Sequence, residues 1–163
     1  MLALNFIVGG QPFFALSIPA CVILYHFAMR LAVGYGINAL MKNRANYKAW
    51  WFRERKWEGG FYGFIKVKKW KKFAPTYAPD TFSPSVKSWE EIAMATCQAE
   101  IVHEIIIALS FLPVLLIIPF GEPLVFILTS VLSALIDAGF VILQRFNRPR
   151  IVKLIQRSAK NEK

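Results

Sequence analysis

AEIVHEIIIALSFLPVLLIIPFGEPLVFILTSVLSALIDAGFVIL, residues 99–143, is the stretch that decides the fold. It holds two apolar runs, 99–120 and 124–143, and a helix of about 20 residues crosses the hydrocarbon core of a bilayer. Gly and Pro at 121–123 predict a short turn, so the two runs form an antiparallel helical hairpin. A third apolar run lies within 13–31. The sequence therefore predicts an all-α membrane protein with about three transmembrane helices.

The charge of the chain predicts how these helices are oriented. Lys and Arg number 20 against 10 Asp and Glu, and they concentrate at 42–72 and 145–163. Because cytoplasmic loops carry an excess of Lys and Arg, we expect these two segments in the cytoplasm and the N-terminus outside. The same charge in a soluble protein would suggest nucleic-acid binding. Here its position beside apolar runs explains it, and no nucleic-acid partner is expected.

We expect a single membrane domain over residues 1–163. Its cytoplasmic parts are an interfacial basic loop at 42–98 and a basic tail at 144–163. Residues 31–40 mix apolar side chains with two glycines. They could continue the first helix, lie at the interface, or form a re-entrant element, and the pattern leaves these alternatives open.

The basic loop is also rich in aromatic residues, which together with long cationic side chains favour the headgroup layer of a membrane. Ser88 followed three residues later by Glu91 is a capping-box pattern that starts a helix. We therefore expect a helix that begins near 89 and leads into the second span. The aromatic residues are Tyr47, Trp50, Trp51, Phe52, Trp57, Phe61, Tyr62, Phe64 and Trp70.

Glu100, His103 and Glu104 form the sharpest chemical signal, since ionisable residues at the edge of a span usually have a partner or a function. An imidazole can take a proton from a hydroxyl, and a carboxylate three residues away can orient it. The alternative is an interfacial cluster paired with loop lysines. Glu-x-x-His is also half of a di-iron site. No carboxylate accompanies the other histidine, His26, so no metal is expected.

Polar residues in and after the third span form a second group of candidates. Asp137 is an intramembrane carboxylate that could face the interior and meet His26 or the Glu100 cluster, in a polar contact between helices. The three arginines that follow could bind phosphate by forked hydrogen bonds, or they could be an ordinary positive stop signal. Two amides beside them favour the binding interpretation. The candidates in this block are Gln144, Arg145, Asn147, Arg148 and Arg150.

Three blocks of the sequence together resemble a known family. They are Lys68-Lys69-Trp70-Lys71, Ala99-Glu100-Ile101-Val102-His103, and Val141-Ile142-Leu143-Gln144-Arg145-Phe146-Asn147-Arg148-Pro149-Arg150. In order and approximate separation they are similar to the glycosyl-4,4'-diaponeurosporenoate acyltransferases of staphyloxanthin-type carotenoid biosynthesis. The resemblance implies a multi-pass protein of a bacterial cell membrane that acylates the primary hydroxyl at C6 of a sugar on a carotenoid.

The resemblance and the residue chemistry together give a working hypothesis. His103, with Glu100 and Glu104, would deprotonate a hydroxyl of a lipid-borne glycosylated acceptor, which then attacks an acyl donor such as acyl-coenzyme A. Phosphates of the donor would be held by basic residues, and no bound cofactor is expected. Candidates for substrate binding, the resemblance included, are Lys69, Trp70, Lys71, Asp137, Gln144, Arg145, Asn147, Arg148 and Arg150.

A different class of function stays open beside this one. A non-catalytic membrane protein could bind anionic lipid or a partner enzyme through the basic aromatic loop. Binding of that kind would weaken with salt and would not need His103. Membrane lipids are expected partners in either case, and an oligomer stays open.

Overall fold

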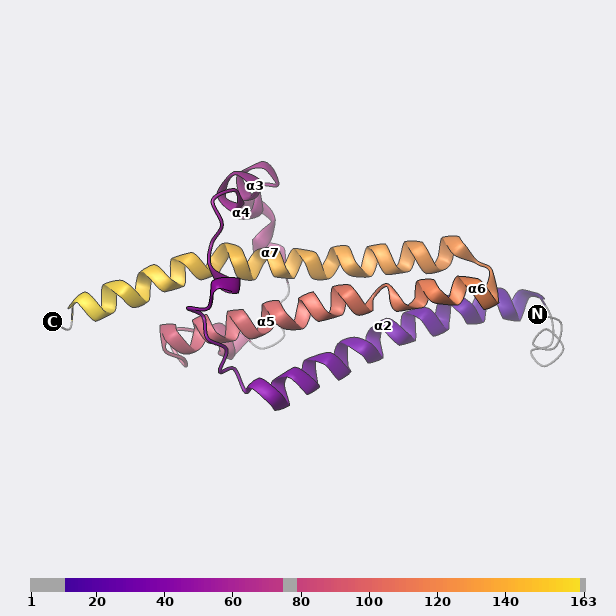
Figure 1. The fold of residues 1–163 in the computed structure, drawn as a ribbon, viewed down its shortest axis with the longest axis horizontal. Helices are drawn as coiled ribbons and strands as arrows, with labels where there is room; N and C mark the ends of the chain where they lie inside the picture. Colours follow the sequence, from indigo (N-terminus) through magenta and orange to yellow (C-terminus); the bar gives the residue numbers. More distant parts are fainter. Residues whose placement is uncertain (1–10, 75–78, 162–163) are drawn as a thin grey trace. The chain divides into compact units, whose positions relative to one another are not determined.

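The computed structural model describes residues 11–74 and 79–161, and every regular element in them is helical (Figure 1). The prediction of an all-α fold is confirmed, and three helices are long and apolar enough to cross a membrane. The α-helices are α2 (Gln11–Met41), α3 (Glu58–Phe64), α4 (Val67–Trp70), α5 (Trp89–Leu109), α6 (Ile117–Phe120) and α7 (Pro123–Asn161). The 3-10 helices are η1 (Trp50–Phe52), η2 (Lys71–Phe73), η3 (Pro79–Phe82) and η4 (Leu112–Leu116).

Helix α5 begins with the predicted capping box. The backbone N–H of Ser88 donates to Oε2 of Glu91 at 2.9 Å, and the N–H of Glu91 donates to Oγ of Ser88 at 3.2 Å. These two bonds satisfy backbone donors that a helix start otherwise leaves unpaired. Lys87 adds an ion pair to Glu91 at 3.0 Å. The helix therefore starts where the pattern placed it.

The apolar run predicted as the second span is not one continuous α-helix. Helix α5 ends at Leu109, and the run continues as η4 and the short α6. Pro113 has no N–H to donate and its ring clashes with a preceding carbonyl, which ends a regular α-helix. Before it, Oγ of Ser110 donates to the carbonyl of Ile106 at 2.8 Å. The apolar length needed for a span is retained, since the segment Trp89–Phe120 still qualifies by length and hydropathy.

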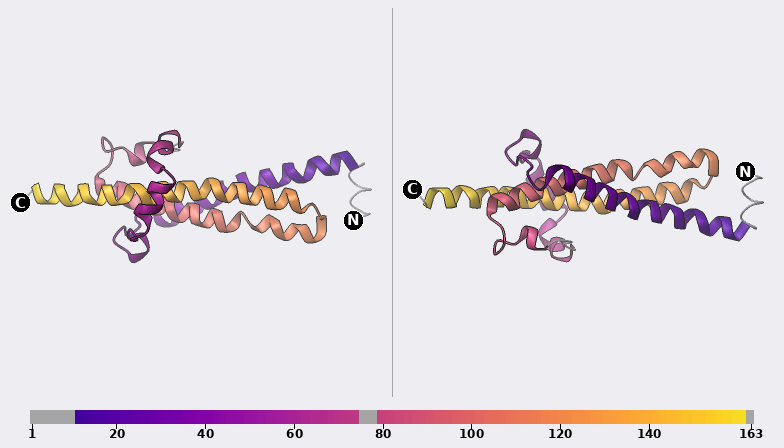
Figure 2. Two further views of the ribbon diagram at one scale, coloured as in Figure 1. Left: turned by 90° about the horizontal axis from the view of Figure 1, so that it is seen from above. Right: turned by 90° about the horizontal axis from the view of Figure 1, so that it is seen from below.

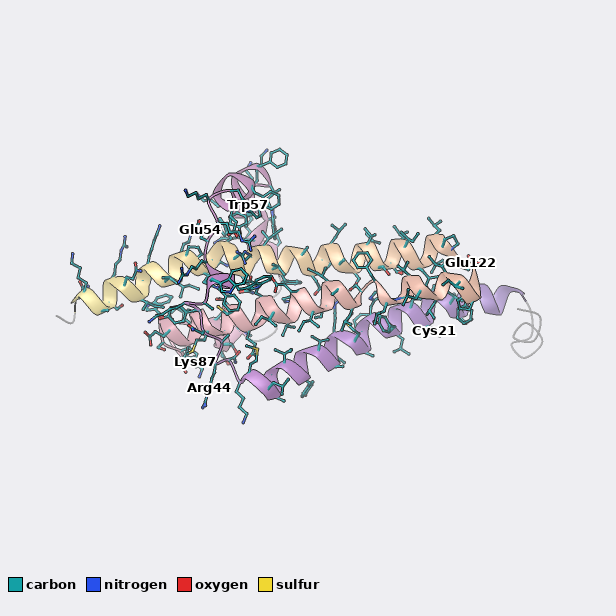
Figure 3. All side chains as sticks on the ribbon, viewed as in Figure 1. Cys21, Arg44, Glu54, Trp57, Lys87 and Glu122 are labelled. Atoms are coloured by element: carbon teal, nitrogen blue, oxygen red, sulfur yellow. The ribbon has the colours of Figure 1, made fainter. Side chains whose placement is uncertain are left out.

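The predicted turn between the second and third apolar runs is present. Helix α6 ends at Phe120 and α7 begins at Pro123. Gly121 adopts a φ of 87°, a backbone conformation that glycine reaches without strain. Pro123 suits the first position of α7, because a helix start leaves that N–H unpaired in any case. Glu122 marks this turn in Figure 3.

Two of the three long helices extend well beyond the predicted spans. Residues 31–40 continue α2 as regular helix to Met41, which answers the question that the sequence left open. Helix α7 runs to Asn161, so the segment expected as a basic tail from 144 is helical as far as that residue. Hydropathy marks the part of a helix that lipid surrounds, whereas helix ends depend on caps and breakers.

The chain divides into two compact units, and α2, α5 and α7 contribute to both. The first unit comprises Met1–Gly36 and Glu104–Ala138, and the second comprises Ile37–His103 and Gly139–Lys163. In the views of Figures 1 and 2, the first half of α7 returns alongside Glu104–Phe120 within the first unit. A hydrogen bond of 2.9 Å between the Oγ atoms of Ser110 and Ser133 joins these segments.

The first unit buries polar side chains and exposes apolar ones. On the outer surfaces of its helices lie large apolar side chains such as Leu24, Phe27, Leu128 and Leu135. This distribution is the reverse of that in a soluble domain and suits helices surrounded by lipid. The buried positions repeat at helical spacing: Ile18, Val22, His26 and Met29 on α2, and Phe126, Ser130, Ser133 and Asp137 on α7.

The second unit has its own small apolar core. Tyr62 of α3, Val67 of α4 and Leu143 of α7 are buried together, and Trp70 and Phe146 pack against them. The core thus fixes α3 and α4 on the second half of α7. Lys66, with a φ of 52°, makes the tight turn that separates the two short helices.

Candidate functional site

Arg145 of α7 is enclosed by acceptors from three other segments of the second unit. Its Nε and Nη2 atoms donate to Oε1 of Glu58 at 3.0 and 2.5 Å, and Nη1 donates to Oε1 of Glu100 at 2.6 Å. The backbone carbonyls of Trp51 and Arg53 accept at 3.2 Å each. A guanidinium has five N–H groups. All five are therefore bound within the protein.

Arg148, one turn further along α7, is among the most deeply buried side chains of the second unit. Its side chain is 2% exposed, and Nη2 donates to Oε2 of Glu100 in a short ion pair. Nε and Nη2 also donate to Oγ1 and the carbonyl of Thr96, at 3.2 and 3.1 Å. Nη1 donates to the carbonyl of Phe52 at 3.3 Å. Arg148 thus ties α5 and η1 to α7.

Glu100 and Glu58 are the two carboxylates of this network, and both are almost fully buried. One oxygen of Glu100 accepts from Arg145 and the other accepts from Arg148. The second oxygen of Glu58 accepts from the hydroxyl of Tyr62 at 2.9 Å. Burial, together with this hydrogen bond, raises the pKa of Tyr62 well above its usual value. We call Glu58, Glu100, Arg145 and Arg148 the ion network.

The ion network gives residues that the sequence analysis selected a role that it did not foresee. The prediction that Arg145 and Arg148 bind substrate stays a prediction, since no substrate tests it. What the structure adds is that both arginines hold η1 to the long helices. Glu58 was not among the predicted site residues. Its signal was that of an acid within an aromatic, glycine-rich stretch of a basic loop.

His103 lies one helical turn after Glu100 on α5. Its ring stacks on the ring of Phe140, with centroids 4.7 Å apart and an angle of 12° between the planes. His103 is half-buried, and so is Glu104, which follows it in the sequence. The stacking fixes the plane of the imidazole and leaves its edge, where both nitrogens are, to point sideways from the Phe140 ring.

Two predicted cations of the second unit, Lys71 and Arg150, lie against the ring of Phe146. Lys71 donates to Oδ1 of Asn147 at 3.5 Å, and its Nζ lies 5.3 Å from the centre of the Phe146 ring. The guanidinium of Arg150 lies 4.2 Å from the same ring. These cation–π contacts hold two positive groups at one place without neutralising them.

Three more predicted residues complete the description of the second unit. Trp70 packs into the apolar core and donates from Nε1 to the carbonyl of Ile65 at 3.1 Å. Lys69 is exposed, and Gln144 is half-buried. Trp70 thus has a packing role, whereas Lys69 presents its charge to the surroundings.

Asp137 belongs to the first unit, where it faces the interior as predicted. Its Oδ2 accepts from Nη2 of Arg30 at 2.5 Å, and the same nitrogen donates to Oγ of Ser133 at 3.0 Å. The sequence analysis expected His26 or the Glu100 cluster as the partner and did not consider Arg30. A single cation within the apolar first span was the signal that could have identified it.

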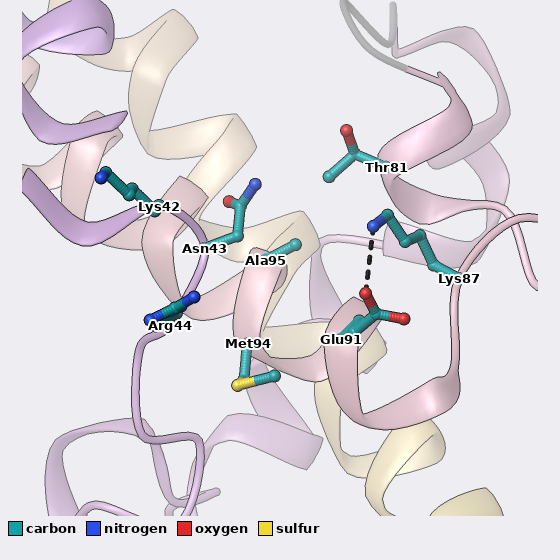
Figure 4. A pocket seen from close by; sticks show the side chains of 8 residues that line it. All are labelled: Lys42, Asn43, Arg44, Thr81, Lys87, Glu91, Met94 and Ala95. Carbon is teal, nitrogen blue, oxygen red and sulfur yellow. Dashed lines mark hydrogen bonds and ion pairs between the residues drawn. The ribbon is translucent and has the colours of Figure 1, made fainter. Parts of the chain in front are cut away.

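A basic cavity of about 290 Å³ lies elsewhere in the second unit (Figure 4). It is formed where the end of α2 passes the start of α5. Lys42 and Asn43 both adopt positive φ, of 48° and 56°, and the N–H of Asn43 donates to Oε1 of Gln98 at 2.6 Å. The residues that line the basic cavity are Lys42, Asn43, Arg44, Thr81, Lys87, Glu91, Met94 and Ala95.

No metal centre stands out in the part of the chain that the structure describes. Across residues 11–74 and 79–161, no three His, Cys, Asp or Glu side chains converge as metal ligands do.

Comparison with known proteins identifies a family. A family model described as glycosyl-4,4'-diaponeurosporenoate acyltransferase matches residues 48–157, which is more than half of the 163-residue chain. The matched segment contains the whole ion network and His103, whereas Arg30 and His26 lie before it. No curated protein and no solved structure matches the chain.

Proposed function

Because the chain belongs to the glycosyl-4,4'-diaponeurosporenoate acyltransferase family, we propose that it moves a fatty acyl group onto a hydroxyl of a glycosylated lipid at the cytoplasmic leaflet. The observation that supports this most directly is the family match over both the ion network and His103. The acceptor class is a glycosyl carotenoid or a similar glycolipid. The three apolar helices support this proposal, because a protein that crosses a bilayer meets such a lipid there.

In this proposal His103 is the general base. A ring nitrogen of His103 accepts the proton of the acceptor hydroxyl while the hydroxyl oxygen attacks the carbonyl carbon of the acyl donor. The tetrahedral intermediate then collapses, the bond to the leaving group breaks, and His103 returns the proton to the leaving thiolate or alkoxide. The stack on Phe140 supports this role, because it restricts the ring to one plane.

The predicted phosphate contacts divide into two groups. All N–H groups of Arg145 are bound within the protein, and most of those of Arg148 are as well. We therefore assign positioning roles to these two residues and to Glu100. In this proposal the phosphates of a donor such as acyl-coenzyme A bind to three other cations, namely Lys69, Lys71 and Arg150. The basic cavity offers a further set of cations for the same chemistry.

The test compares two substitutions of the same histidine. His103→Phe keeps a ring that can stack on Phe140 and removes the proton acceptor, whereas His103→Ala removes both. Membrane lipids of host cells that make the acceptor are compared by mass spectrometry at equal protein abundance. We expect the intact protein to form the acylated glycolipid. Both variants should reduce the amount of this product about 100-fold or more.

Two other outcomes would change the assignment. Substantial product from His103→Phe, with none from His103→Ala, would give His103 a packing role and remove it as the base. Identical lipid profiles with intact protein, both variants and empty cells would favour the binding of anionic lipid or a partner enzyme through the basic aromatic loop.

A further inference from the structure

His26 and Ser130 are buried polar residues of the first unit whose side chains make no hydrogen bond to the described residues. His26 is 5% exposed and Ser130 is fully buried. Within the described residues, neither nitrogen of His26 makes a hydrogen bond, and the Ser130 hydroxyl does not either. A buried polar group without a hydrogen-bond partner destabilises the folded state, because it has given up its bonds to water. Such groups are rare in folded proteins and need an explanation.

These two residues lie at the same level of α2 and α7. Val22 packs with Phe126 in one apolar cluster, and Arg30 binds Ser133 and Asp137. His26 is midway between Val22 and Arg30 on α2. Ser130 lies between Phe126 and Ser133 on α7. His26 and Ser130 therefore lie at a similar depth of the first unit, between the apolar cluster and the ion pair of Arg30 with Asp137.

An apolar cavity of about 500 Å³ begins one helical turn away from this level. Ile18, Val22 and Tyr25 of α2 line it, with Leu112 and Leu116 of η4 and Phe126 of α7. The ring of Tyr25 also meets the ring of His26 edge-on, with centroids 5.4 Å apart. The volume is within the range of about 300–1,000 Å³ that small-molecule sites occupy.

We propose that the first unit binds a fatty acyl group, with the hydrocarbon chain in this cavity and the carbonyl or carboxylate oxygen at His26, Ser130 and Arg30. The cavity lies in a unit whose outer surfaces are apolar, so a lipid chain can reach it without crossing water. The polar end offers one hydroxyl, one imidazole and one partly used guanidinium. That set fits a single carboxyl or carbonyl group and is too small for a sugar.

The inference rests on the proposed function in one respect only, namely that fatty acyl groups are ligands of this protein. Binding itself can be measured without turnover. The full chain in lipid nanodiscs is exposed to a palmitic acid that carries a diazirine near its methyl end, and the crosslinked residues are mapped by mass spectrometry. We expect crosslinks in residues 17–25 and 112–126 that excess palmitic acid removes.

Two neighbouring residues of α2 provide a matched pair of variants. Val22 is 4% exposed and lines the cavity, whereas Ile23 is 51% exposed. Val22→Trp should fill the cavity and reduce the competed crosslinking at least about 10-fold, which corresponds to 1.4 kcal/mol. Ile23→Trp should leave it unchanged. His26→Leu should weaken the binding of palmitic acid. It should not weaken the binding of the hydrocarbon analogue that lacks the carboxyl group.

The outcomes separate this inference from the proposed function. Crosslinks spread over Ile23, Leu24 and Phe27, without competition, would mean contact with bulk lipid only and would overturn the inference even if Val22→Trp fails to fold. Acylated glycolipid formed by a protein with no competed crosslinks would also overturn it. Competed crosslinks without product would support the acyl site and contradict the proposed reaction.

Discussion

At the scale of single residues, the ion network makes Arg148 a sensitive position. Arg148→Met leaves Glu100 buried with one cation fewer, and breaking a buried pair costs about 3–5 kcal/mol. We expect a markedly lower midpoint of thermal unfolding in detergent. Arg150→Met is the matched control, since Arg150 is exposed and contacts the Phe146 ring only from outside.

Restoring the balance of charge should recover part of that loss. The double variant Glu100→Leu with Arg148→Met removes both members of one pair and leaves Arg145 with Glu58. Replacing a buried pair by apolar side chains is often neutral or stabilising. A double variant less stable than Arg148→Met alone would show that Glu100 matters chiefly through Arg145.

Because of Tyr62, we expect the free energy of unfolding to depend on pH in the alkaline range. Its pKa is raised in the folded protein, so the folded state keeps a proton that the unfolded state loses above about pH 10. The stabilisation that the protonated Tyr62 gives the folded state is complete below that pH. It is lost as the pH rises toward the pKa of Tyr62 in the folded protein. Tyr62→Phe should lose less stability between about pH 9 and pH 11 than the unsubstituted protein. Chemical unfolding at the two pH values measures this, with Tyr47→Phe as control.

The residues of the site could be predicted from sequence only in part. Glu100, Arg145 and Arg148 stood out because charges at the edge of an apolar run are conspicuous. Their partners were not predictable, since Glu58 and Arg145 are 87 residues apart and only tertiary packing joins them. Arg30 was missed because a lone cation at the end of an apolar run also fits a boundary of the span.

At the scale of elements, the start of α5 depends on the capping box. Ser88→Ala removes the hydroxyl that accepts from the N–H of Glu91. Loss of an N-cap side chain costs about 0.5–2 kcal/mol. We expect faster hydrogen exchange at the amides of the first turn of α5 and little change beyond it. Ser85→Ala, at an exposed serine before the helix, should leave exchange in that turn unchanged.

Element boundaries show where prediction from sequence was limited. The hairpin turn and the start of α5 carry local signals, namely Gly121, Pro123 and the Ser88–Glu91 pair, and both were predicted correctly. The interruption at Pro113 was not predicted, because hydropathy treats proline inside a long apolar run as neutral. The continuation of α7 to Asn161 lies beyond the long apolar run, and there only a few apolar residues such as Ile151, Leu154 and Ile155 recur among basic ones.

At the scale of the whole molecule, the distribution of charge predicts the orientation in the membrane. We expect the turn with Glu122 outside and the segment with Lys87 in the cytoplasm. Glu122→Cys should react in intact cells with a maleimide that cannot cross the membrane. Lys87→Cys should react only after the cells are broken. Both variants need Cys21 and Cys97 replaced by serine or alanine first. The reverse labelling pattern would contradict the predicted orientation.

The ion network has a consequence for the order in which the chain is made. Glu100 leaves the ribosome well before Arg145 and Arg148, the two arginines whose side chains pair with it. A carboxylate at the edge of a newly made span, with no cation yet beside it, opposes the burial of that end of the helix away from water. We therefore expect the Glu100 end of α5 to stay in contact with water until α7 has been made and its two arginines can pair with that carboxylate.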